Sequence, residues 1–412
     1  MDDHSDKKLI KGVSWIFLIN IVIAVLNFTF LMFFARSLGA NIMGAYAAIV
    51  VGLDLITAVF NFGFNQAAIK TRYDKEVYSA ALVAVSVQSL LILFVTMLTY
   101  AVFVYIGDSN IESMFIPGLL LLFSRVITNF STLFYAKLEV DFEYNKIALI
   151  RLVSTVLGIA VGYFVLKYQG GIYTLVTRDF IIAALMFSMV VYIAKPSMKF
   201  RIKRSSWDDL WVFSSGVWYL NLLERFSLRI DYGIIGLMLG KESLGVYYTI
   251  RSIFEGLLGF ILSPIQTVLF SFYCGADSKV KIFLKAFRLS MICVILLAII
   301  GLAVSYYWGD FILNKVLGDE YSSGTDMLYG FILMMMSVII YEHSKVFSMS
   351  IGKHLQFILS RLIQIIFLLL LTYPMVTYYG YFGAGMVTGM GALVLMVTST
   401  YIILRQVQKV KV

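Results

Sequence analysis

The chain has 412 residues, of which 60% are hydrophobic and only 14% are charged. Soluble domains carry about a quarter charged residues, so this composition excludes a water-soluble enzyme, a secreted disulfide scaffold and a disordered chain. It indicates an integral membrane protein. The two cysteines and three histidines follow no disulfide or metal-ligand spacing, so we expect neither a metal nor another cofactor.

Twelve apolar stretches in the sequence are each long enough for a helix to cross the hydrocarbon, which takes about 20 residues. The first stretch is followed by others and lacks a small-residue cleavage site, so we do not expect a removable signal peptide. Strands of a membrane barrel would be shorter and would alternate in polarity. We therefore predict an all-α polytopic membrane protein with spans at 13–35, 43–68, 79–106, 114–136, 147–167, 171–194, 210–238, 243–270, 286–307, 325–350, 355–379 and 381–404.

Basic residues between the spans predict the orientation of the chain. With a cytoplasmic N-terminus, the cytoplasmic segments hold 21 Lys and Arg and the opposite side holds four. Positive charge collects in short cytoplasmic loops, so both termini are predicted to be cytoplasmic, and the net charge of +9 indicates contact with anionic lipid rather than nucleic acid. A basic run near the middle predicts an N-terminal lobe (1–194), a cytoplasmic linker (195–209) and a C-terminal lobe (210–412).

The two halves resemble each other when the sequence is shifted by 201 residues. "SLGANIMGAY" (37–46) then lies over "MLGKESLGVY" (238–247), and seven identities fall within 36 positions. Chance similarity between apolar segments is the alternative. Because six spans per half is an even number, both halves start on the same side, and such parallel repeats predict two six-helix lobes around a central cavity, as in transporters.

Apart from Lys167, Arg288 and Asp326 at the span ends, fourteen charged residues lie inside the predicted spans. An ionised side chain at mid-bilayer costs roughly 3 kcal/mol, so these groups must face protein or water, and we favour a polar cavity. The bases are Arg125, Arg151, Arg178, Arg225, Arg229, Arg251, Arg361 and Lys345, and the acids are Asp54, Asp179, Glu224, Asp231, Glu255 and Glu342.

Seven of these eight bases are arginines, which indicates an anionic substrate. A guanidinium binds phosphate oxygens bidentately and stays protonated when it is desolvated. Arg225 and Arg229 are one helical turn apart, which places their side chains about 6 Å apart. We predict that these two arginines bind a diphosphate, helped by Arg251, and that Arg125 and Arg178 are further substrate-binding candidates. The alternative is that the arginines bridge helices by pairing with acids.

A polar stripe follows the second predicted span. Asp54, Thr57, Asn61 and Asn65 fall within about 80° on a helical wheel, which favours a pore lining over a helix contact. The 201-residue shift lays Asp54 over Glu255, so the halves present acids at equivalent depth. We predict that these two acids act in coupling or gating.

Other acids in the C-terminal half are candidates for the same role. Glu224 and Asp231 are seven residues apart on one helix face and are predicted to act with Glu255 in coupling or gating. For Glu255, an ion pair with Arg251 one turn away is the alternative.

Two further charge pairs carry expectations about side-chain contact. Arg178 and Asp179 are adjacent and point about 100° apart on a helix, so we do not expect them to face each other. Glu342 and Lys345 are three residues apart and are expected to satisfy each other.

Three segments resemble a known family: "FARSLGANIMGAYAAI" (34–49), "NFGFNQAAIK" (61–70) and "RIDYGIIGLMLGKESLGVYYTIRSI" (229–253). They are similar to the polysaccharide-transport branch of the multidrug/oligosaccharidyl-lipid/polysaccharide exporter superfamily, in particular to Wzx-type O-antigen or capsule repeat-unit flippases. Members often carry Asp before the glycine of the second segment, where this chain has Asn61 and Phe62 before Gly63.

This resemblance implies two six-helix lobes and a cavity lined largely by helices 1, 2, 7 and 8. It implies a flippase in the bacterial cytoplasmic (inner) membrane that moves undecaprenyl-diphosphate-linked oligosaccharides to the outer leaflet. A proton or sodium gradient is the implied energy source, and a glycan polymerase is the implied partner.

Two other functions remain open at this point. A multidrug exporter of organic cations belongs to the same superfamily, although its site would be acid-rich, whereas the spans here hold eight bases and six acids. A polytopic glycan polymerase or ligase usually needs larger outer loops than this chain has. The sequence has no Walker loop and no HExxH or GxSxG motif, so we expect no direct use of ATP, no catalytic residues and no enzyme.

Overall fold

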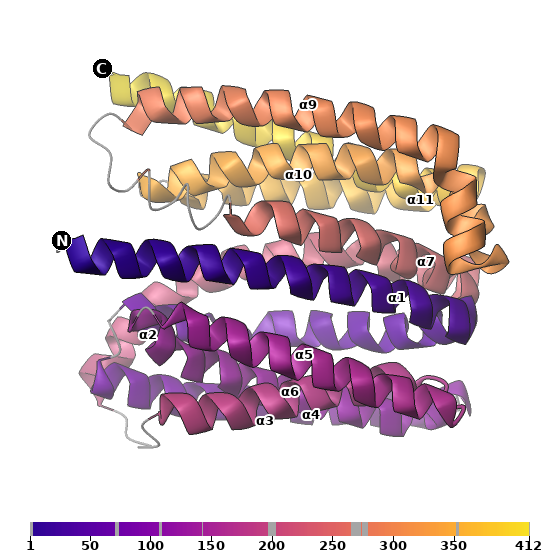
Figure 1. Cartoon of the computed structure of the whole chain (residues 1–412), viewed down its shortest axis with the longest axis horizontal. Helices are drawn as coiled ribbons and strands as arrows, with labels where there is room; N and C mark the ends of the chain where they lie inside the picture. Colours follow the sequence, from indigo (N-terminus) through magenta and orange to yellow (C-terminus); the bar gives the residue numbers. More distant parts are fainter. Residues whose placement is uncertain are drawn as a thin grey trace. The chain divides into compact units, whose positions relative to one another are not determined.

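The computed structural model describes residues 3–70, 74–106, 109–141, 143–196, 203–264, 273, 279–351 and 354–411. These residues form helices and short connections, with no strand among them (Figure 1). The α-helices are α1 (Asp3–Phe60), α2 (Phe64–Lys70), α3 (Lys75–Ile106), α4 (Ser109–Val140), α5 (Tyr144–Lys167), α6 (Tyr173–Ala194), α7 (Arg204–Pro264), α9 (Lys279–Phe311), α10 (Met327–Ser350) and α11 (Phe357–Lys411). A π-helical turn (Ile312–Leu317) and two 3-10 turns (Asp319–Gly324 and His354–Gln356) complete the assignment. The predicted all-α polytopic fold is confirmed.

Three helices are too long to cross a membrane only once. α1, α7 and α11 contain 58, 61 and 55 residues, which at 1.5 Å per residue gives more than about 80 Å, against a hydrocarbon thickness of about 30 Å. Each is interrupted by one glycine with non-helical backbone angles, namely Gly39, Gly240 and Gly380. These glycines lie between predicted spans, so each long helix supplies two of the twelve spans, and α3, α4, α5, α6, α9 and α10 supply one each.

Within the described ranges, eight helical segments are long and apolar enough to cross a membrane. α7 is not one of them, because Glu224, Arg225, Arg229, Asp231, Arg251 and Glu255 interrupt its apolar sequence. Of the predicted span 243–270 in this region, residues 265–270 lie outside the described part of the chain.

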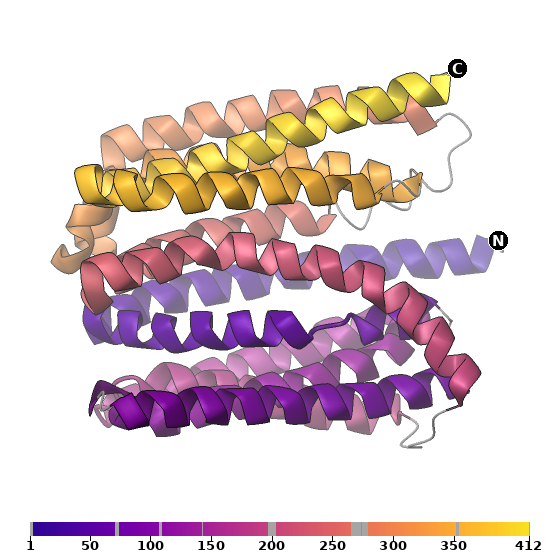
Figure 2. The ribbon, with the colours of Figure 1, turned by 180° about the vertical axis from the view of Figure 1, so that it is seen from behind.

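One compact unit consists of Met1–Asn27 and Ile49–Arg225. In this unit α4 packs against α3 and α6, and α5 packs against α6 (Figures 1 and 2). Small residues in its core, Ala67, Ala68, Ala80, Ala81 and Ala84, allow the helices to approach closely. The predicted linker at 195–209 stays a prediction, and its residues 197–202 lie outside the described part.

The second compact unit consists of Phe28–Ala48 and Phe226–Val412. Here α10 packs against both α9 and α11 (Figure 2). A side chain added at Gly330 of α10 would overlap the carbonyl oxygen of Gly385, and one added at Gly389 would overlap the carbonyl oxygen of Gly330. These glycines therefore let the two helix backbones meet directly.

The part of α7 in the second unit folds back on itself at Gly240. The rings of Tyr232 and Tyr247 lie 5.2 Å apart across the bend, and Leu244 packs against Gly236. Arg251 of the returning arm reaches Asp231 of the outgoing arm. The two arms are therefore antiparallel, as two consecutive membrane spans must be.

The bends in α1 and α7 have the same backbone conformation. Gly39 has φ 79° and ψ 165°, and Gly240, which is 201 residues later, has φ 82° and ψ −177°. Only glycine adopts such angles readily. The conformations match at the offset that the sequence repeat predicts, which supports duplication over chance similarity.

Candidate functional site

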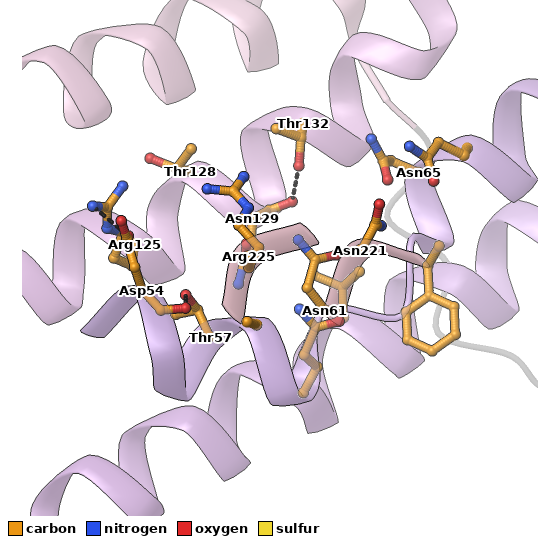
Figure 3. A pocket seen from close by; sticks show the side chains of 15 residues that line it. Asp54, Thr57, Asn61, Asn65, Arg125, Thr128, Asn129, Thr132, Asn221 and Arg225 are labelled. Carbon is orange, nitrogen blue, oxygen red and sulfur yellow. Dashed lines mark hydrogen bonds and ion pairs between the residues drawn. The ribbon is translucent and has the colours of Figure 1, made fainter. Parts of the chain in front are cut away.

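A polar pocket of about 330 Å³ lies within the first unit, among α1, α2, α3, α4 and the first part of α7. Figure 3 shows its labelled side chains around one space, with Asp54 and Arg125 at one end, Asn65 at the other and Arg225 between them. The lining residues are Asp54, Thr57, Ala58, Asn61, Phe64, Asn65, Gln66, Val85, Gln88, Arg125, Thr128, Asn129, Thr132, Asn221 and Arg225. Amide, hydroxyl and charged groups thus dominate a pocket between apolar helices.

All four residues of the predicted polar stripe line this pocket. They do not share one continuous helix, however, and that expectation was wrong: α1 ends at Phe60 and α2 begins at Phe64. The break includes Gly63 at φ 70°, and the side-chain oxygen of Asn61 accepts a hydrogen bond of 3.2 Å from the Gly63 N–H. Because of this local turn, the polar stripe begins on α1 and continues on α2.

The face of α4 that lines the pocket presents Arg125, Thr128, Asn129 and Thr132. Their spacing of +3, +4 and +7 places them on one side of a helix. Sequence reasoning found Arg125 but did not use Thr128 and Thr132. The sequence contains a signal that could have identified them, because these four residues form a second polar stripe like the one on the second predicted span.

Two other lining residues were also missed as site candidates. Gln88 is 6% exposed and lies on α3. Asn221 lies on α7 and is the counterpart of Asn20 at the 201-residue offset. Nothing in the sequence places either of them beside Asp54, because that proximity depends on tertiary packing.

Asp54 is paired with Arg125 at the end of the pocket. The distance from Arg125 Nη2 to Asp54 Oδ1 is 2.8 Å, and the side chains are 36% and 6% exposed respectively. The Nε of Arg125 is buried and has no hydrogen-bond partner among the described residues. Among the described lining residues, Asp54 is the only one with a carboxylate, and an arginine with a spare donor neutralises it.

Arg225 lines the same pocket with an exposed side chain. Among the described residues it makes no hydrogen bond and no ion pair, unlike Arg125. Because Asp54 and Arg125 cancel, the lining carries one net positive charge at Arg225.

Arg178 and Asp179 on α6 form an ion pair, and the expectation that they do not face each other was wrong. Nε and Nη2 of Arg178 lie 2.9 and 2.7 Å from Oδ1 of Asp179. The arginine side chain is long enough to curl around the helix and reach its neighbour. The predicted pair of Glu342 and Lys345 is confirmed at 2.7 Å.

The second unit contains a buried polar cluster centred on Arg251, which is 1% exposed. Its Nε donates to Glu255 at 3.0 Å, its Nη2 donates to the carbonyl oxygen of Leu228 at 3.1 Å, and its Nη1 pairs with Asp231. Nη1 also lies 3.0 Å from the hydroxyl of Tyr247. Each nitrogen of this guanidinium is engaged by protein groups.

Asp231 connects both arms of α7 to α11. Its Oδ2 accepts hydrogen bonds from Tyr247 at 2.7 Å and Thr388 at 3.1 Å, and its Oδ1 accepts the N–H of Tyr232 at 2.9 Å. With 1% exposure and Arg251 as a partner, this carboxylate is fully satisfied inside the protein.

Arg229 and Glu255 lie at the edge of this cluster. Arg229 Nη1 is 3.8 Å from Glu255 Oε2, and the side chains are 15% and 32% exposed. The guanidinium of Arg229 also lies 5.2 Å from the centre of the Tyr232 ring. Glu224 is partly buried on the portion of α7 that belongs to the first unit, and it is not part of the pocket lining.

Seven of the nine predicted site residues fall into two groups, and Arg178 and Glu224 belong to neither. Asp54, Arg125 and Arg225 meet in the pocket of the first unit, whereas Arg229, Asp231, Arg251 and Glu255 meet in the cluster of the second unit. The first group offers hydrogen-bond donors and a cation to a ligand. The second group is largely saturated by its own contacts. The roles predicted for both groups stay predictions.

A sequence model of the family described as "Polysaccharide biosynthesis protein" matches residues 33–326. A search of curated proteins found no significant match.

Solved structures similar to this chain are membrane transporters and a flippase. The lipid II flippase MurJ in an inward closed conformation has a TM-score of 0.74 and 14% identity, over 94% of this chain and 86% of that one. A multidrug resistance MATE family transporter in an inward-facing conformation has a TM-score of 0.72 and 12% identity, over 96% and 99%. The MATE transporter VcmN of Vibrio cholerae in the bent form has a TM-score of 0.63 and 16% identity, over 98% and 97%. These similarities establish a shared fold.

Proposed function

Because the chain belongs to the polysaccharide biosynthesis protein family, we propose that it is a flippase for a lipid-linked oligosaccharide. Its substrate is an O-antigen or capsule repeat unit on undecaprenyl diphosphate, which it moves from the cytoplasmic to the outer leaflet of the bacterial cytoplasmic membrane by alternating access. The fold that it shares with the lipid II flippase supports this proposal.

The observation that carries the proposal is the state of Arg225. Its guanidinium faces a polar pocket within membrane-spanning helices, and no group of the described protein pairs with it. An exposed guanidinium in a polar pocket is hydrated and remains available to an incoming anion. A diphosphate supplies that anion, and a guanidinium binds it through two parallel hydrogen bonds.

Arg229 is the second arginine in the proposal. It lies one helical turn further along α7, and its Nη1 is 3.8 Å from Glu255 Oε2. We propose that a phosphate oxygen replaces this carboxylate, because a guanidinium binds phosphate bidentately. Arg125, Arg178 and Arg251 are each bonded to a carboxylate. We propose that direct contact with the substrate belongs first to Arg225, and that these three contact it only where a phosphate oxygen replaces their own carboxylate.

Coupling to H⁺ or Na⁺ is proposed at Asp54 and Glu255, with Glu224 and Asp231 as further participants. Asp54 is bonded to Arg125 at 2.8 Å and Glu255 to Arg251 at 3.0 Å, so both repeat-related acids have an arginine partner. Binding of a cation at either acid competes with that arginine. Breaking these pairs is therefore the step by which an ion gradient acts.

Export of organic cations is the second candidate function, and the fold shared with MATE transporters favours it. The pocket of the first unit disfavours the binding of organic cations, because the carboxylate of Asp54 is neutralised and the described lining has a net positive charge. A glycan polymerase or ligase has less support, since the pocket lining contains no unpaired acid or nucleophilic cysteine to carry that chemistry.

Binding of undecaprenyl diphosphate to the purified full chain tests the proposal. We expect Arg225→Ala to weaken binding about tenfold, the loss of one charge-assisted pair, and Arg225→Lys to weaken it less. Arg151→Ala is the matched control, because Arg151 is an intramembrane arginine on α5 that is absent from the pocket lining. Equal affinities for the wild type and Arg225→Ala would contradict the assignment.

A further inference from the structure

We propose that the pocket of the first unit binds the sugar next to the diphosphate, as a neutral, hydroxyl-bearing pyranose ring held by amide side chains. This inference rests on the proposed function and adds a sugar subsite to it. The substrate's diphosphate lies at Arg225, and its first sugar extends among the amides of the same pocket.

The lining contains far more hydrogen-bonding capacity than a diphosphate uses. Six of its side chains are amides: Asn61, Asn65, Gln66, Gln88, Asn129 and Asn221. An amide presents both donors and an acceptor, and a threonine hydroxyl does the same. Phosphate oxygens only accept, whereas each sugar hydroxyl donates and accepts, so the mixed lining matches a sugar.

Two buried donors in the pocket point to an oxygen-bearing ligand. Nδ2 of Asn129 and Nε of Arg125 are buried without a hydrogen-bond partner among the described residues, and the two residues are one turn apart on α4. A buried donor left unsatisfied loses the hydrogen bond that water would give it in the unfolded chain. A hydroxyl or ring oxygen placed along this face of α4 satisfies both.

The size and layout of the pocket limit what enters it. A volume of about 330 Å³ equals that of about eleven liquid water molecules, which suits about one or two pyranose rings and not a whole repeat unit. Figure 3 shows Arg225 between Asp54 and Asn65, and Asn221 lies one helical turn before Arg225 on α7. A phosphate held by Arg225 therefore places an attached sugar in the same pocket as Asn221 and Asn129.

The charge of the pocket selects a neutral sugar over an organic cation. Asp54, the one acid in the lining, is bonded to Arg125. No free carboxylate of the lining is then available to a positively charged ligand, while neutral hydroxyls need only the amides.

The test compares two lipids on the purified full chain: undecaprenyl diphosphate, and the same lipid carrying N-acetylglucosamine or galactose at its first position. We expect either sugar to strengthen binding about tenfold, the effect of a few hydrogen bonds. The Asn129→Leu, Asn221→Leu double variant should lose most of this gain while its affinity for the bare lipid stays within about twofold. Asn129→Leu breaks no protein hydrogen bond of Nδ2, so retained binding of the bare lipid also reports an intact fold.

Asn314→Leu is the matched control, because Asn314 has a buried side-chain oxygen without a partner among the described residues but lies on the π-helical turn and not in the pocket. It should keep the full sugar-dependent gain. Equal affinity of the wild type for bare and glycosylated lipid would overturn the sugar subsite. An equal loss of affinity for both lipids in the double variant would overturn it as well. Both results would leave the proposed function standing. Failure of the wild type to bind any of these lipids would overturn both.

Discussion

Gly44 and Gly245, which are 201 residues apart, meet backbone to backbone within the second unit. A side chain on Gly44 would overlap the carbonyl oxygen of Lys241, and a side chain on Gly245 would overlap the carbonyl oxygen of Ala40. Ala40 and Lys241 are also 201 residues apart, so the contact is reciprocal. The duplicated segments thus cross at their duplicated glycines.

Alanine at either of these glycines should weaken the crossing. Because the clash is with a backbone carbonyl and not with a flexible side chain, the two segments must separate, and we expect Gly44→Ala and Gly245→Ala each to lower stability by about 1–3 kcal/mol. Thermal unfolding of the purified protein measures the effect. Gly52→Ala is the control on the same helix, since nothing lies within 4 Å of an added Cβ there. Equal melting temperatures for all three variants would contradict the crossing.

Arg251 and Arg225 should respond differently to truncation. Arg251→Ala leaves Asp231 buried without its cation, and breaking such a pair costs about 3–5 kcal/mol, so the yield of folded protein should fall. Arg225→Ala removes no protein contact and should change stability by less than about 0.5 kcal/mol. Denaturation of both variants measures the difference. A stable Arg251→Ala protein that has lost lipid binding would instead assign Arg251 directly to the substrate.

The Asp54–Arg125 pair predicts a coupling energy between two substitutions. Asp54→Asn and Arg125→Gln should each lower stability, and the double variant should recover part of the loss, with a coupling energy of about 0.5–3 kcal/mol. Asp54→Asn should also slow turnover while leaving lipid binding largely intact, since an acid does not bind the diphosphate. If the stability changes of the two single variants simply add in the double variant, the ion pair contributes no stability. Loss of lipid binding by Asp54→Asn with unchanged turnover per bound lipid would contradict the gating role.

Reporter fusions test the predicted orientation of the chain. Fusions after Glu143 and Arg204 should report the cytoplasm, and fusions after Gly170 and Gly318 should report the opposite side, because basic residues are concentrated in the former loops. A reversed signal at Arg204 would be the most damaging result, since this residue separates the two predicted halves.

The sequence was sufficient for the parts of the fold that depend on local pattern. Span length predicted the helices, and the 201-residue repeat predicted the equivalence of Gly39 and Gly240, whose backbone angles agree. The stripe from Asp54 to Asn65 predicted pocket residues correctly because polar side chains in an apolar span face protein or water, although the break at Gly63 divides them between α1 and α2.

Other features depend on tertiary packing and had no local signal. The break at Gly63 contains no proline, and a glycine alone is compatible with a continuing helix. Arg125 reaches Asp54 from another helix, and Gln88 and Asn221 join them from two more, which no spacing within one span reveals. The pairing of Arg178 with Asp179 depends on how a flexible side chain curls, which the wheel position of its Cβ does not determine.

Lipid translocation by the full chain in proteoliposomes tests the central claim most directly. The probe is undecaprenyl diphosphate carrying a fluorescent N-acetylglucosamine, and a membrane-impermeant quencher reports the fraction in each leaflet. We predict translocation well above that of empty liposomes, at least tenfold lower for the Arg225→Ala, Arg229→Ala double variant, which loses two charge-assisted contacts, and unchanged for Arg151→Ala. Transport of the organic cation ethidium by the same proteoliposomes, without movement of the lipid, would contradict the account.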